Sequence, residues 1–218
     1  MRKLKSHKDF IFVVKLSGDG RYALSATAPH ARDRSPRIWD LRTGRCHVLQ
    51  SGDWGHNTYT LSKAGNVALT NHKDGTIRVW DVDTGRCRHV LAGHKGIVYC
   101  VLSTSDGTTA VSVNNDGTKR IWDLRTGHCR HILGHTQQAT WPLPVISSDD
   151  RFIVTGEDRH SVRVWDIDTG ACLCTLEGHT EEITWLGVSA DGHRVVSVEK
   201  THRAYVWELD WDDFGTQG

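Results

Sequence analysis

The sequence predicts an all-β protein, a β-propeller of five four-stranded antiparallel blades. A tryptophan that follows an aliphatic residue and precedes an acid recurs at Trp39, Trp80, Trp122, Trp165 and Trp207, in steps of 41, 42, 43 and 42 residues. Short apolar runs alternate with glycine-containing turns between these tryptophans. A period near 42 residues indicates a repeat protein, and four short strands per repeat are typical of a propeller blade.

The third repeat, residues 94–133, shows the elements of one unit most clearly. We expect strands over residues 97–102, 110–113, 119–124 and 128–133. Turn signals at Asp106-Gly107, Asp116-Gly117 and Thr126-Gly127 separate them. A helical repeat would need apolar residues at i, i+3 and i+4 over ten or more residues, and these short runs do not have that pattern.

Composition excludes several classes of function. The 218 residues carry 27 basic and 26 acidic side chains, so no basic surface for nucleic acid or membrane is indicated. We find no long apolar run and no secretory signal pattern, and therefore expect a cytoplasmic protein. Equivalent cysteines in four repeats, Cys46, Cys87, Cys129 and Cys172, indicate packing rather than disulfides, and Cys172-Leu173-Cys174 lacks zinc-site spacing. We expect neither a metal nor a cofactor.

Three features carry a family resemblance: the Trp-Asp pairs, the turn glycines, and the Gly-His pairs at Gly93-His94, Gly134-His135 and Gly178-His179. Over nearly the whole chain they resemble the WD40-repeat family. The TGRC and TGHC turns and the ELDW ending look like those of bacterial WD-repeat arrays. The resemblance implies one propeller domain over residues 1–218, with blades at about 7–49, 50–91, 92–133, 134–176 and 177–210.

The resemblance also implies a polar tetrad in each blade: a histidine before the first strand, a hydroxyl on the second, an aspartate in the next turn, and the tryptophan. The matching residues are His7, Ser25, Asp33 and Trp39; Thr70, Asp74 and Trp80; His94, Ser112, Asp116 and Trp122; His135, Thr155 and Trp165; His179, Ser197 and Trp207. Blade two has Gly52-Asp53 in place of Gly-His, blade four has Arg159 at the aspartate position, and blade five has Thr201 there. Only blades one and three are expected to be complete. Because the set recurs in every repeat, we assign it to structure rather than catalysis.

The two ends of the chain raise the question of ring closure. No Thr-Gly turn follows Trp207, so blade five lacks an obvious fourth strand. Leu4 precedes His7 by three residues, as Leu91 precedes His94, and we expect residues 2–5 to pair onto blade five as that strand. A closed five-bladed monomer, an arc completed by a second copy, and a piece of a longer array are the three possibilities.

Candidate partner-binding residues lie where the repeat is broken or where loops gather on one rim. They are His30, Arg32 and Arg34 in the enlarged loop of blade one, Trp54, His56 and His72 in blade two, Tyr99 in blade three, Trp141 in blade four and Trp185 in blade five. Trp141-Pro142-Leu143-Pro144 predicts a bulge in the first strand of blade four. The alternative for each residue is an ordinary solvent-exposed loop position or a role in packing between blades.

The sequence contains no nucleophile elbow, phosphate-binding loop or His-Glu-x-x-His motif. We therefore expect a non-catalytic scaffold that presents its rim loops to protein or peptide partners. A propeller that binds a carbohydrate or another small ligand, or a fragment of a longer sensor array, is the alternative. We expect no nucleic-acid or membrane partner.

Overall fold

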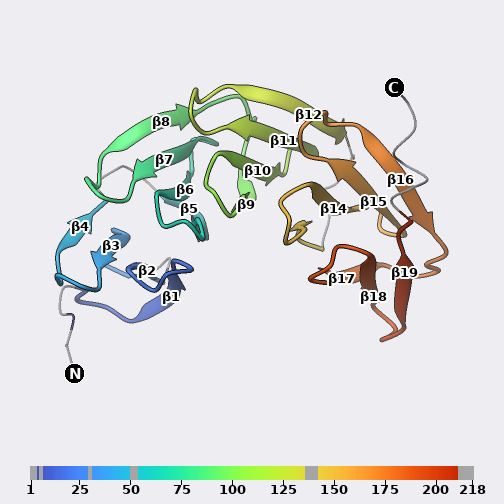
Figure 1. Cartoon of the computed structure of the whole chain (residues 1–218), viewed down its shortest axis with the longest axis horizontal. Helices are drawn as coiled ribbons and strands as arrows, with labels where there is room; N and C mark the ends of the chain where they lie inside the picture. The colour runs from blue at the N-terminus through green and yellow to red at the C-terminus, as the bar shows by residue number, and fades with distance from the viewer. Residues whose placement is uncertain (1–3, 5–6, 29–30, 50–53, 136–141, 211–218) are drawn as a thin grey trace. The chain divides into compact units, whose positions relative to one another are not determined.

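The computed structural model describes residues 4, 7–28, 31–49, 54–135 and 142–210, without the side chains of 54–57 and 135. Every element in this part of the chain is a strand (Figure 1). The strands are β1 Ile11–Leu16, β2 Tyr22–Thr27, β3 Arg37–Asp40, β4 Cys46–Val48, β5 Trp54–Leu61, β6 Val67–His72, β7 Ile77–Asp81, β8 Cys87–Leu91, β9 Val98–Ser103, β10 Thr109–Asn114, β11 Thr118–Asp123, β12 Cys129–His135, β13 Val145–Ile146, β14 Phe152–Glu157, β15 Ser161–Asp166, β16 Cys172–Glu177, β17 Ile183–Val188, β18 Arg194–Glu199 and β19 Ala204–Glu208. Nowhere in the described chain is there a helix long and apolar enough to cross a membrane.

The strands form five sheets in which neighbours along the chain pair with each other. Four sheets have four strands, β1–β4, β5–β8, β9–β12 and β13–β16, and the described part of the fifth has three, β17–β19. We call these sheets blades one to five. The antiparallel units expected from the repeat are present, and the strands of blade three begin and end within two residues of the expected positions.

The strand predicted over residues 2–5 lies outside the described residues, apart from Leu4, which is in no strand. Its pairing with blade five stays a prediction.

The first strand of blade four differs from the expectation. We predicted a bulge at Trp141-Pro142-Leu143-Pro144, but β13 has only two residues and its register with β14 is regular. The strand begins directly after Pro144, because a proline cannot donate to the ladder. Pro142 is buried against Gly156, where an added Cβ would lie 2.6 Å from Pro142 Cδ. The prolines therefore shorten this strand instead of bending it.

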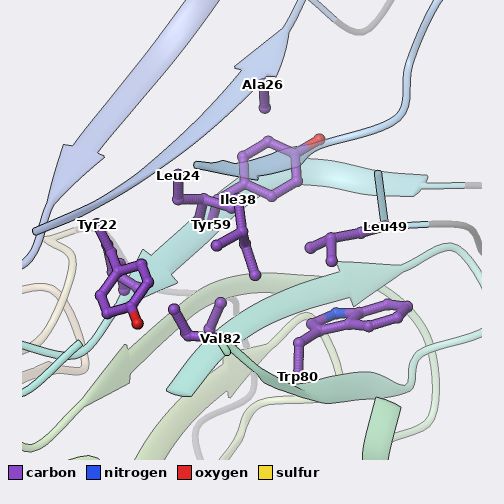
Figure 2. Packing of buried hydrophobic residues seen from close by; sticks show 10 residues of the cluster. Tyr22, Leu24, Ala26, Ile38, Leu49, Tyr59, Trp80 and Val82 are labelled. Carbon is purple, nitrogen blue, oxygen red and sulfur yellow. The ribbon is translucent and has the colours of Figure 1, made fainter. Parts of the chain in front are cut away.

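The chain divides into two compact units. The first has residues 1–115 and 122–129, and the second has residues 116–121 and 130–218. In the first unit one apolar cluster joins blades one and two, and a second joins blades two and three. Figure 2 shows the first cluster, in which Leu24, Ile38 and Leu49 of blade one lie in one group with Tyr59 and Trp80 of blade two. In the second unit a third cluster joins blades four and five.

All three clusters are built in the same way. The earlier blade contributes aliphatic residues of its second and third strands, for example Leu69 and Val79 of blade two. The later blade contributes residues of its first strand, for example Val98 and Val101 of blade three. We call the surface toward the next blade the trailing face and the surface toward the preceding blade the leading face. Each junction thus joins one trailing face to one leading face.

A histidine on the fourth strand also ties three blades to the turn that follows the tryptophan strand of the next blade. The Nε2–H groups of His47, His89 and His131 donate to the carbonyls of Asp83, Arg125 and Asp168, at 3.0, 3.0 and 2.8 Å. The turn glycine beneath each ring, for example Gly127, has a φ of 76°, and a Cβ there would lie 3.0 Å from His89. These turns need glycine both for the left-handed backbone and for the close approach of the ring.

Candidate functional site

A hydroxyl on the second strand is the centre of a polar network in every blade. The indole N–H of each repeat tryptophan donates to it over 2.7–2.9 Å, in the pairs Trp39–Ser25, Trp80–Thr70, Trp122–Ser112, Trp165–Thr155 and Trp207–Ser197. His7, His94 and His179 place Nε2 within 2.6–2.7 Å of the hydroxyl of their blades. The side chain of His135 lies outside the described part. Buried polar groups are costly without partners, so this network stabilises the blade interior.

The fourth position of the network differs from the sequence expectation in blade five. We predicted an incomplete set with Thr201 in place of the aspartate, and that prediction is wrong. Nδ1 of His179 lies 3.2 Å from Oε2 of Glu199, which is two residues after the central Ser197. Thr201 donates to the other oxygen of Glu199 over 2.6 Å. This hydrogen bond lowers the pKa of Glu199, and the one to His179 adds to it, against the effect of burial.

The same strand position carries a buried polar residue in all five blades, namely Thr27, His72, Asn114, Glu157 and Glu199. The sequence pattern did not single out this position, because the family resemblance implies the acid in the turn. The available signal was a polar residue two places after the serine or threonine in an otherwise apolar strand. Residues i and i+2 of a strand lie on the same face, so this polar residue is next to the central hydroxyl.

The turn aspartates Asp74 and Asp116 accept hydrogen bonds within their own turns. Asp74 accepts from the backbone N–H and the hydroxyl of Thr76 at 2.9 and 2.6 Å, and Asp116 accepts from Thr118 at 2.9 and 2.7 Å. These are contacts that close the turn.

In blade one, Arg37 lies between the histidine and the aspartate. Its Nη2 donates to Asp33 over 2.7 Å and its Nη1 donates to Nδ1 of His7, whereas Asp33 itself lies 3.9 Å from His7. Because an arginine can only donate, Nδ1 of His7 accepts and Nε2 carries the proton toward Ser25. Burial and then the Arg37 charge lower the pKa of His7. Burial raises the pKa of Asp33, but Arg37 outweighs it and the net shift is downward.

Blade four contains a buried ion pair at the same position. Glu157 accepts from Thr155 over 3.3 Å and contacts Nζ of Lys119, which lies on β11 within the same compact unit. Both charged side chains are almost fully buried. Removal of one partner of such a pair typically costs about 3–5 kcal/mol, because the other charge is left uncompensated.

His72 is not on the rim, contrary to its prediction as a partner-binding residue. It is 1% exposed and its Nε2 lies 3.1 Å from the hydroxyl of Thr70. Burial, together with the charge of Arg78, lowers its pKa to about 4. It is the last residue of β6, where the side chain points toward the network instead of into the loop.

The other partner-binding candidates come from several elements. Arg32 and Arg34 are exposed on the enlarged loop of blade one, where Nε of Arg34 donates to the Ala31 carbonyl over 3.1 Å. Trp185 of β17 is 55% exposed, and Tyr99 of β9 is half-buried. His30 and Trp141 lie outside the described residues, as do the side chains of Trp54 and His56. The structure therefore brings Arg32 and Arg34 together on one loop and leaves Trp185 and Tyr99 on separate strands.

Trp185 lies flat across the backbone of its own strand. A Cβ added to Gly187 would be 2.4 Å from Cη2 of Trp185, so the end of the ring lies against the Cα of Gly187. More than half of Trp185 stays exposed. Among the described residues, no cluster of three His, Cys, Asp or Glu side chains is arranged to hold a metal ion.

Repeated antiparallel blades with a tryptophan–hydroxyl network define a class of repeat protein. The family model described as "WD domain, G-beta repeat" matches residues 1–40, 85–123, 127–166 and 170–208. The chain belongs to the WD40-repeat family.

Curated relatives cover most of this chain. Autophagy-related protein 16 of Arabidopsis thaliana is 28% identical over 94% of it, and nuclear distribution protein PAC1 of Coccidioides posadasii is 28% identical over 96%. A probable E3 ubiquitin ligase complex SCF subunit sconB of Arthroderma otae is 31% identical over 89%. The chain spans 40%, 41% and 25% of the lengths of these three relatives. They come from a plant and two fungi, and give no support to the expected resemblance to bacterial arrays.

Proposed function

We propose that this chain is a non-catalytic scaffold that binds a protein or peptide partner. His7, His94 and His179, and the carboxylates of Glu157 and Glu199, lie in hydrogen-bond networks inside the blades, which suits a structural role for them. The relative described as a subunit of a ubiquitin ligase complex is in keeping with a place in an assembly. A cytoplasmic location, and a set of partners without nucleic acid or membrane, stay predictions from the composition.

Trp185 is the observation that carries this proposal. A tryptophan that is 55% exposed offers a large apolar ring, with one polar N–H group, to a partner. Tryptophan and arginine are the residues that most often dominate binding energy at protein interfaces. Trp185 would act as the apolar anchor for its partner.

Arg32 and Arg34 form a second candidate contact region on the loop of blade one. Both guanidinium groups are exposed, whereas Arg37 of the same blade is buried in the network. These two residues would favour an acidic segment of a partner, since arginine binds carboxylates with two parallel hydrogen bonds.

The test is capture by crosslinking from the source cell, with wild type compared with Trp185→Ala and with an Arg32→Ala/Arg34→Ala double variant. We expect one protein to be captured by wild type and to be reduced at least tenfold with Trp185→Ala, because anchor residues typically contribute about 2 kcal/mol or more. Ile132→Ala is the matched control, since Ile132 is also an exposed large apolar residue but lies on β12. Undiminished capture with both test variants would place the binding surface elsewhere. Specific binding on a glycan array without protein capture would favour the small-ligand alternative.

A further inference from the structure

The leading face of blade one is open, although the same positions are covered in other blades. Counted from the network histidines, Ile11 and Val14 correspond to Ile183 and Leu186 of blade five. Ile183 and Leu186 are 0% and 3% exposed, within the cluster that blade four completes. Ile11 and Val14 are 44% and 58% exposed. A contiguous exposed apolar surface such as the leading face of blade one indicates an interaction site.

The open face contains a hollow of about 410 Å³. Its lining has the apolar side chains of Leu4, Ile11, Val14, Ala23 and Trp39, together with His7, Asp9 and Ser25. Leu16, which follows Val14 by two residues on the same face of β1, is also exposed. The hollow thus continues into an apolar strip along the first strand. In the three described junctions, the preceding blade covers residues of the first strand.

The chain also has an open trailing face, on blade five. Val206 holds the position of Val79 and Val164, directly before the repeat tryptophan. Val79 and Val164 are both 0% exposed, inside junctions, whereas Val206 is 63% exposed. Ala204, two residues earlier on β19, is exposed as well. This surface has the aliphatic character that covers a leading face elsewhere in the molecule.

We infer that the leading face of blade one docks the trailing face of blade five of a second copy of this chain. Every copy carries both halves of the junction, and the same kinds of residue already pack together in three places within the chain. The contact is head-to-tail, so each copy uses two different surfaces. This inference is independent of the proposed partner site, because Trp185 belongs to neither set of docking residues.

The experiment is sedimentation velocity over a hundredfold range of concentration, with wild type, Val14→Asp, Val206→Asp and an equimolar mixture of the two variants. Wild type should self-associate as concentration rises, and each variant alone should stay monomeric. The mixture should form a one-to-one heterodimer, because each variant keeps the one face that the other has lost. Val90→Asp is the control, since Val90 is exposed on β8 and lies on neither docking face.

All three substituted positions are exposed, so circular dichroism should show wild-type folding. A wild type that is monomeric throughout would overturn the inference and indicate that the face is covered by the same chain or by another segment of the protein. A mixture that stays monomeric would also overturn it, as would loss of association in Val90→Asp. The function of the partner site is not tested by these measurements, so the two proposals can fail separately.

Discussion

Blade one and blade five have the same repeat pattern but different surroundings. Each has an isoleucine four residues after its network histidine, at Ile11 and Ile183. The first is 44% exposed and the second is fully buried against blade four. A repeat thus determines which residues are suited to a junction, and the neighbouring blade determines whether they are buried.

The histidines of these two blades differ in a similar way. His179 faces the carboxylate of Glu199, whereas His7 faces the guanidinium of Arg37. The neighbours have opposite charges, although each histidine lies beside a central serine at nearly the same distance. The two networks therefore differ in the charge that faces Nδ1 of the ring.

The largest expected effect comes from truncation of the two isoleucines. Ile183→Ala should lower the free energy of unfolding by about 2–5 kcal/mol, because it removes buried methyl groups and leaves a cavity. Ile11→Ala should lower it by less than about 1 kcal/mol, since that side chain is largely exposed. Urea unfolding of dilute protein, followed by tryptophan fluorescence, measures both. Equal losses would mean that the leading face of blade one is already covered at low concentration.

An intermediate effect should identify the fourth member of the blade-five network. Glu199→Ala leaves His179 without its carboxylate partner and should cost about 1–3 kcal/mol. Thr201→Ala removes only an exposed hydroxyl that supports Glu199, and should cost less than about 1 kcal/mol. Thermal unfolding of the two variants, scanned under identical conditions, makes the comparison. A larger loss with Thr201→Ala would restore the original expectation for this position.

The smallest expected effect is a pH dependence that arises in blade one. The pKa of folded His7 lies below its ordinary value of 6.5, so at pH values below 6.5 the unfolded chain binds a proton that the folded chain does not. The contribution of His7 to the free energy of unfolding is fully present above pH 6.5 and falls as the pH drops toward the folded pKa. Between pH 7 and pH 5 wild type should therefore lose about 1 kcal/mol or less that His7→Gln does not lose.

The control for the pH experiment is His128→Gln, which changes an exposed histidine in a turn. The measurement is the unfolding free energy of wild type and both variants at several pH values. A pH slope that is the same in wild type and His7→Gln would exclude a contribution from His7.

Much of the fold could be predicted from local signals. The glycine turns and short apolar runs located the strands of blade three within two residues, since turn chemistry and alternation act over a few neighbouring residues. The pairing of each tryptophan with a second-strand hydroxyl was expected from the resemblance to the WD40-repeat family, and the hydrogen bonds confirm it. The first strand of blade four was predicted less well, because two prolines can end a strand as readily as bend it.

The polar networks show where prediction from the repeat failed. Glu157, Glu199 and His72 occupy one strand position, but the family pattern directs attention to the turn aspartate instead. His72 looked like a loop residue because it is the last residue before a turn, and only its contact with Thr70 shows that it is buried. The role of Arg37 was also missed. Its contacts with His7 and Asp33 cross the enlarged loop of blade one, which has no counterpart in the other repeats.

The repeat period and the four-stranded unit can be predicted from the sequence alone, and the resemblance to the WD40-repeat family adds the tryptophan–hydroxyl pair of each blade. These properties depend on residues that are close in the chain or that recur at a fixed interval. The residue that completes each network, and the junction faces that are covered, depend on the tertiary structure. Those outcomes depend on contacts between distant segments, as with Lys119 and Glu157, which are 38 residues apart in the chain and form a buried ion pair. Burial and charge pairing are properties of such neighbours, and no single repeat contains them.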